Sequence, residues 1–198
     1  MEAEPGVATL PAALRKRLRY AGDDLEIGLS SWAGLFGAAR DAEPGWLRLG
    51  RPENGVAFTA AGIAALAGLA AEQDAVGRAI VAAVALAMPR IGDVLGLVEG
   101  DETILLPEPD EIGPALVPLR VRVHDPGPQG GHAALLGIAF ACPWDPEHGL
   151  GVLLRTSEVL GVDTAEAVLS RPVAEAAAQG RHAFFLSCRP VAPARRRR

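Results

Sequence analysis

The densest group of side chains that could do chemistry in this chain runs from Trp144 to Gly149. Asp145, Glu147 and His148 supply two carboxylates and an imidazole within four positions. Such side chains can ligate zinc or a hard cation. A carboxylate beside an imidazole can also perform acid–base chemistry near neutral pH. One hypothesis is therefore a metal-binding or hydrolytic site at this segment, and His124 or His132 could complete a metal shell.

The same residues also fit a structural turn. Asp145 can accept backbone N–H bonds in an Asx turn, Pro146 presets φ, and Gly149 permits a left-handed exit. Trp144 would then pack on a sheet, with its indole N–H bonded to a loop group. Because adjacent residues of a tight turn rarely all point to one centre, we favour the structural turn. We expect no catalytic residue, no metal and no cofactor, and we keep as binding candidates Trp144, Asp145, Glu147, His148 and Gly149.

Other chemical motifs are weak. The two cysteines, Cys142 and Cys188, are far apart and form no CxxC, so neither a disulfide framework nor a cysteine-based zinc site is supported. The glycine-rich residues 127–131 lack the lysine and the helix start of a phosphate-binding loop. Trp32 and Trp46 are expected to anchor the core rather than hold a ligand. The sequence therefore favours binding over catalysis.

Strands are predicted on both sides of the turn. Residues 132–142 form an apolar run typical of a buried central strand, and residues 150–154 are the returning strand. Residues 116–124 alternate apolar and polar, which predicts a strand with one wet face. Residues 45–50 and 56–58 flank an Asn-Gly turn and predict a hairpin.

One long alanine-rich helix is predicted at about residues 60–88, with Thr59 as its N-cap. It could also be two helices with a kink near Gln73. Pro89 is expected to end it, because proline disfavours helix at the residue before it. These elements predict an α+β fold, in which an antiparallel sheet packs against this helix with short flanking helices. We expect an N-terminal extension at 1–22, a single α+β domain at 23–168, and a C-terminal extension at 169–198 that ends in a basic tail.

Composition excludes several classes of protein. The chain has 198 residues, of which 49% are hydrophobic and 22% charged, so it is not wholly disordered. The net charge is −5, and without the last four arginines 15 basic residues face 24 acidic ones, a net of −9. An acidic body repels phosphate, so nucleic-acid binding is not expected except through Arg195, Arg196, Arg197 and Arg198. We favour a solvated tail without a partner over an electrostatic arm.

Targeting signals are not predicted either. The N-terminus is acidic and has no apolar stretch like that of a secretory signal. Residues 60–88 are mostly alanine and are interrupted by charges, so we expect no membrane span. The expected location is the cytoplasm.

Residues 140–152 resemble a bacterial family of domains of unknown function that carries a WDxEHGxGV signature. In that family a long helix precedes two strands and a short VG-x-x-D segment follows, which residues 160–164 match only in part. The resemblance covers about residues 26–168. It implies a single-domain bacterial protein, some of whose relatives resemble antitoxin or immunity partners of secreted toxins.

Two main functions follow from these observations. The first is a non-catalytic interaction protein of the immunity or antitoxin kind, whose acidic surface meets a basic, toxin-like protein. Its candidate contacts are Glu108, Asp110, Glu111, Asp145 and Glu147. The alternative is a metal-binding or hydrolytic enzyme that uses Asp145, Glu147 and His148. A nucleic-acid accessory protein acting through the arginine tail is a third, less favoured hypothesis.

Overall fold

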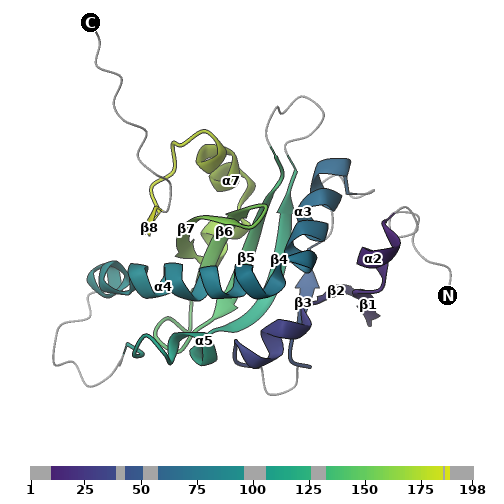
Figure 1. Cartoon of the computed structure of the whole chain (residues 1–198). Helices are drawn as coiled ribbons and strands as arrows, with labels where there is room; N and C mark the ends of the chain where they lie inside the picture. Colours follow the sequence, from purple (N-terminus) through teal and green to yellow (C-terminus); the bar gives the residue numbers. More distant parts are fainter. Residues whose placement is uncertain are drawn as a thin grey trace, which may run out of the picture.

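In the described part of the chain, one sheet of eight strands, ordered as they follow along the chain, organises the fold (Figure 1). The structure, a computed structural model, describes residues 10–38, 43–50, 58–95, 106–125, 133–184 and 186–187. The strands are β1 Leu18–Ala21, β2 Asp24–Gly28, β3 Trp46–Leu49, β4 Val117–His124, β5 Leu135–Ala141, β6 Leu150–Arg155, β7 Glu158–Thr164 and β8 Leu186–Ser187. All neighbours are antiparallel except β3 and β4, which are parallel. A parallel pair needs a long crossover, and here the crossover carries the two main helices.

The first face of the sheet holds the main core. Figure 1 shows α4 (Gln73–Leu95) lying across this face, with α3 (Ala60–Ala71) beside β4. Shorter elements, α2 (Ala12–Arg15), η1 (Ser30–Gly34) and α5 (Ile112–Ala115), pack against these two helices. The strand residues of this core are aliphatic or aromatic and buried: Ile27, Leu47, Leu49, Val121, Val123, Leu136, Ile138, Phe140, Leu150, Val152, Leu154, Val159 and Val162. Burial of their alternating side chains fixes which face each strand presents to the helices.

The described residues cover the second face only in part. The short helices α6 (Ala165–Leu169) and α7 (Arg171–Ala178) pack on the half of the sheet formed by β5, β6 and β7. Val168 sits directly over Gly137 and Gly151, where a Cβ on either glycine would overlap Val168. These glycines therefore let α6 lie close to the sheet. A smaller core forms here from Leu135, Leu153, Leu160, Val168, Ala174 and Ala177.

The predicted α+β class is confirmed, and the long helix is replaced by two helices. α3 ends at Ala71 and α4 begins at Gln73, which is the kinked alternative. Thr59 caps α3 as predicted, since its Oγ1 accepts from Gly62 N at 3.3 Å. The predicted end at Pro89 is wrong, because α4 continues through Pro89 to Leu95. Ile91, beyond the proline, is buried in the main core, so packing outweighs the local disfavour of proline.

The strands β4, β5 and β6 match the strands predicted at 116–124, 132–142 and 150–154. The segment at 45–50 forms β3, but its neighbours are β2 and β4. β3 is therefore not the first strand of the predicted hairpin. Residues 51–57, which hold the predicted turn, lie outside the described residues.

Residues on both sides of the predicted central domain contribute to the packed body. Leu10 and Leu14 are buried in the main core, and β1 pairs with β2. On the C-terminal side, Ala174 and Ala177 of α7 belong to the smaller core, and β8 pairs with β7. The basic tail at 195–198 lies outside the described residues.

The stretch Gln73–Val94 of α4 is long and apolar enough to cross a membrane by length and composition alone. Half of it is buried inside the structure, where α4 packs on the first face of the sheet. A core helix of a soluble protein passes the same test, so the stretch is weak evidence for a membrane span.

Candidate functional site

The turn at residues 142–149 joins β5 to β6 and is closed by its own hydrogen bonds. Asp145 Oδ1 accepts a hydrogen bond from His148 N at 3.0 Å, and His148 Nδ1 lies 3.0 Å from the same oxygen. Gly149 N donates to the Asp145 carbonyl at 2.9 Å. Gly149 has φ +63°, a conformation that other residues rarely adopt. The Asp145 carboxylate therefore accepts a backbone N–H three residues on, one position further than in the predicted Asx turn, and the segment is still a turn closed by its own bonds.

Trp144 fixes the turn to the main core. Its side chain is buried, with an exposed fraction of 1%. The expected loop partner of the indole N–H does not occur, because Nε1 has no hydrogen-bond partner among the described residues. Burial of the large indole surface is therefore what this tryptophan contributes.

Only two of the three candidate chemical groups of the turn come together. Asp145 and His148 form a carboxylate–imidazole pair, in which the carboxylate is 13% exposed and the imidazole 59%. Glu147 is exposed and makes no ion pair with a described residue. His124 lies far from the turn along β4 and is bound near α6, with its Nε2 2.7 Å from the Val168 carbonyl oxygen. His132 lies outside the described residues. Within the described ranges, no three His, Cys, Asp or Glu side chains are grouped so that they could hold a metal ion.

Cys142, at the start of the turn, is buried. Burial raises the pKa of its thiol to about 11, and the Sγ donates to the Asp145 carbonyl at 3.7 Å. The thiol is therefore protonated near neutral pH. It does not supply a thiolate nucleophile that could act together with the neighbouring His148.

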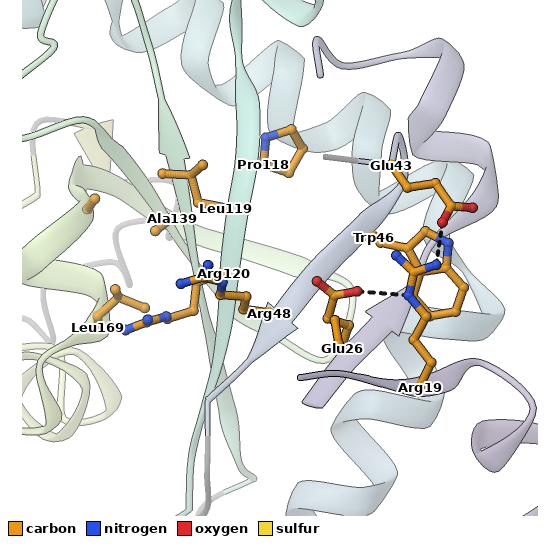
Figure 2. Close-up of a pocket in the computed structure, with 12 residues that line it drawn as sticks. Arg19, Glu26, Glu43, Trp46, Arg48, Pro118, Leu119, Arg120, Ala139 and Leu169 are labelled. Carbon is orange, nitrogen blue, oxygen red and sulfur yellow. Dashed lines mark hydrogen bonds and ion pairs between the residues drawn. The ribbon is translucent and has the colours of Figure 1, made fainter. Parts of the chain in front are cut away.

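A cavity of about 630 Å³ lies on the second face of the sheet, beside α6 (Figure 2). Its polar lining is Arg19, Glu26, Glu43, Arg48 and Arg120. Its apolar lining includes Trp46, Pro118, Leu119, Ala139 and Leu169. The sequence had not singled out this group. The only signal for it in the sequence is the set of polar residues that alternate with apolar ones along β3 and β4. The pairing of these two strands cannot be predicted from the sequence.

Arg19 organises one side of the cavity. Its Nε lies 2.8 Å from Glu26 Oε2, it forms a second ion pair with Glu43, and its guanidinium stacks 3.9 Å from the Trp46 ring centroid (Figure 2). The hydrogen bond from Arg19 holds the pKa of Glu43 below its usual value, and the two carboxylates raise the pKa of Arg19.

Of the two tryptophans expected in the core, only Trp32 lies there. Trp32 is buried, and its Nε1 donates to the Gln73 carbonyl at 2.7 Å. Trp46 is half-buried and lines the cavity, so the prediction that it anchors the core is wrong. The indole alternates with Leu47 along β3 and is therefore carried to the opposite face of the sheet.

The described residues form an α+β domain. At one end of its sheet lies a polar turn closed by its own hydrogen bonds, and the described helices α6 and α7 cover part of the second face. A family model described as "Domain of unknown function (DUF6985)" matches residues 36–169, and the chain belongs to this family. The matched range includes the turn and most of the cavity lining. No curated protein and no solved structure matches the chain.

Proposed function

We propose that this protein is a non-catalytic interaction domain of the immunity or antitoxin kind, which binds a basic, toxin-like protein in the cytoplasm. The observation that carries this proposal is the position of two acidic segments. Residues 108–111 precede α5 and β4, and the turn follows β5. Because Val117 of β4 pairs with Ala141 of β5, both segments lie at the same end of the sheet, beside α5 in Figure 1.

We call this surface the acidic end and define it by Glu108, Asp110, Glu111, Asp145 and Glu147. Four of these side chains are exposed, and Asp145 is half-buried. None of Glu108, Asp110 and Glu147 makes an ion pair with a described residue. An unpaired acidic surface speeds and orients the approach of a basic partner.

The bonding of the turn supports binding rather than catalysis. The Asp145 oxygen that faces His148 also accepts the His148 backbone N–H. The nearest thiol, that of Cys142, is kept protonated by burial. The hydrogen bonds that hold the turn therefore occupy the carboxylate of Asp145, which an enzyme would need available for its substrate.

The test is affinity capture from the source cells with three forms of the chain. The wild-type chain should recover one basic protein in stoichiometric amount. The triple variant Glu108→Lys, Asp110→Lys, Glu147→Lys should lose it. The matched control reverses three exposed carboxylates elsewhere, Glu72→Lys, Asp93→Lys and Glu158→Lys, and should retain it. Recovery of no stoichiometric partner, or equal recovery by both variants, would refute the proposal.

A second candidate function is a metal-binding or hydrolytic enzyme at the turn. The observation that favours it is the 3.0 Å contact between Asp145 Oδ1 and the exposed His148 imidazole, because a carboxylate can orient a catalytic histidine. This function predicts metal bound after gentle purification, or hydrolytic activity, lost in His148→Ala without loss of stability. If His148→Ala has a lower melting temperature than the wild type, and neither protein contains metal or shows activity, the turn has a structural role only.

A further inference from the structure

A single row of side chains crosses the open part of the second face. The strand register places Arg19 opposite Glu26, Glu26 opposite Arg48, Arg48 opposite Arg120, and Arg120 opposite Ala139. Along this row the charge changes sign from β1 to β2 and from β2 to β3. It does not change from β3 to β4, where two arginines face each other. Opposite charges on facing positions stabilise a sheet, whereas like charges directly opposite destabilise it. The row therefore has a defect between Arg48 and Arg120.

Existing acidic groups do not repair this defect. Glu26 and Glu43 are both bonded to Arg19. Arg48 has one exposed partner, Asp24, whose Oδ2 lies 3.2 Å from its Nε. Arg120 is exposed and has neither an ion pair nor a side-chain hydrogen bond with a described residue. Among the described residues, the Arg120 guanidinium in the cavity is thus left without an anionic partner.

The part of the cavity beside Arg120 has an apolar wall. Ala139 continues the row on β5, and Leu169 of α6 forms the wall beyond it. Leu119 stands at a register shift between Pro118 and Arg120 and is 43% exposed, although it is a large hydrophobic residue. A cavity of about 630 Å³ falls in the range of small-molecule sites, which combine an apolar lining with a few placed polar groups.

We propose that this cavity binds a small organic anion, whose carboxylate or phosphate group lies between Arg48 and Arg120 and whose apolar body contacts Leu119 and Leu169. A guanidinium binds either head group through two parallel N–H···O bonds. The bound anion supplies the negative charge that the row lacks. This site lies on the second face of the sheet and does not depend on the acidic end.

Calorimetric titration with phenyl phosphate tests the site, with inorganic phosphate and benzoate as parallel probes. Phenyl phosphate should bind more tightly than inorganic phosphate, because its ring reaches the apolar wall. Comparison with benzoate identifies the preferred head group. Arg120→Gln should weaken phenyl phosphate binding by about tenfold or more, which is the scale of one charge-assisted hydrogen bond. The matched control Arg90→Gln removes one exposed positive charge from α4, on the other face, and should leave binding unchanged.

A second variant separates binding from folding. Arg120→Glu places a carboxylate opposite Arg48 and completes the alternating row, so the melting temperature without ligand should rise by about 1–2 °C while phenyl phosphate binding is lost. The proposal is overturned if no probe binds at millimolar concentration. It is equally overturned if Arg120→Gln binds phenyl phosphate as the wild type does, or if Arg120→Glu lowers the melting temperature.

Discussion

Asp145 illustrates how far a single residue could be interpreted from the sequence. The spacing of Asp145, Pro146 and Gly149 predicts an Asx turn with a left-handed exit. In the structure the Asp145 carboxylate accepts the backbone N–H of His148, three residues on, and Gly149 has φ +63°. The prediction of a turn succeeds because all its atoms lie within five residues. The fate of Trp144 depends on distant core residues, and the unpartnered indole nitrogen could not be predicted from its neighbours.

Replacing Asp145 tests the structural role of the turn. Asp145→Ala removes the acceptor for the His148 backbone N–H and should lower the free energy of unfolding by about 1–2 kcal/mol. Asp145→Asn keeps a side-chain oxygen and should retain most of the stability. Urea unfolding of the three proteins measures both effects. Equal stability of wild type and Asp145→Ala would contradict the role given to this side chain.

Cys142 gives a prediction about pH. Its pKa in the folded protein, about 11, lies above the ordinary thiol value of 9.0, so the unfolded chain loses the proton first as pH rises. The stabilising contribution is complete below pH 9 and is lost as pH rises towards 11. In a Cys188→Ser background, stability should fall over this window, and Cys142→Ala should remove that part of the fall. A fall of the same size in both proteins would show that other groups cause it.

The same thiol should react slowly. At pH 8 a thiol reagent should modify Cys142 in the folded Cys188→Ser protein far more slowly than in urea, because the side chain is buried and protonated. Absorbance of the released thiolate measures both rates. Similar rates in the two states would contradict the buried position of Cys142.

At the scale of the elements, local sequence patterns predicted where strands and helices occur. They predicted less well where each element ends and which strands pair. The hydrophobic alternation of β4 and the N-cap at Thr59 are local signals, and both predictions are confirmed. The parallel pairing of β3 with β4 joins residues about seventy positions apart, so no local pattern specifies it. The cavity lining comes from that pairing, which is why the sequence did not reveal it. The continuation of α4 past Pro89 was missed for the same reason, since Ile91 beyond the proline is buried in a core formed by distant residues.

Pro89 provides a test of α4. A proline inside a helix removes the hydrogen bond to the carbonyl four residues earlier and crowds it. Because Pro89 is exposed, Pro89→Ala should raise the free energy of unfolding by about 1–2 kcal/mol, after the greater freedom of the unfolded chain is included. Pro109→Ala, at an exposed turn outside the helices, should give no gain. A loss of stability in Pro89→Ala would mean that α4 needs the proline geometry.

The close seat of α6 gives a second test at this scale. A Cβ on Gly137 would overlap the backbone carbonyl of Val168, so Gly137→Ala must push α6 away from β5. We expect a loss of about 2–4 kcal/mol in the free energy of unfolding, comparable to other strained core changes. Gly34→Ala is the control, because no atom lies within 4 Å of its added Cβ. Chemical unfolding measures the stability of both variants. Similar stabilities of Gly137→Ala and Gly34→Ala would contradict the close packing of α6 on β5.

For the whole molecule, charge is distributed unevenly rather than simply negative. The net charge of −5 was available from the sequence, but its division between surfaces was not. Sheet pairing gathers acidic side chains at the acidic end, and the register gathers arginines on the second face. We propose that the acidic end binds a basic protein and that the cavity binds a small anion.

The salt dependence of partner binding tests the central proposal most directly. The dissociation constant of the complex with the captured partner is measured by calorimetry at increasing NaCl concentration. We expect the affinity of the wild-type chain to fall steadily with salt, because screening weakens the attraction between exposed charges. The triple variant Glu108→Lys, Asp110→Lys, Glu147→Lys should bind far more weakly at low salt. An affinity that is independent of salt, or equal in the wild type and the triple variant, would contradict an interaction through the acidic end.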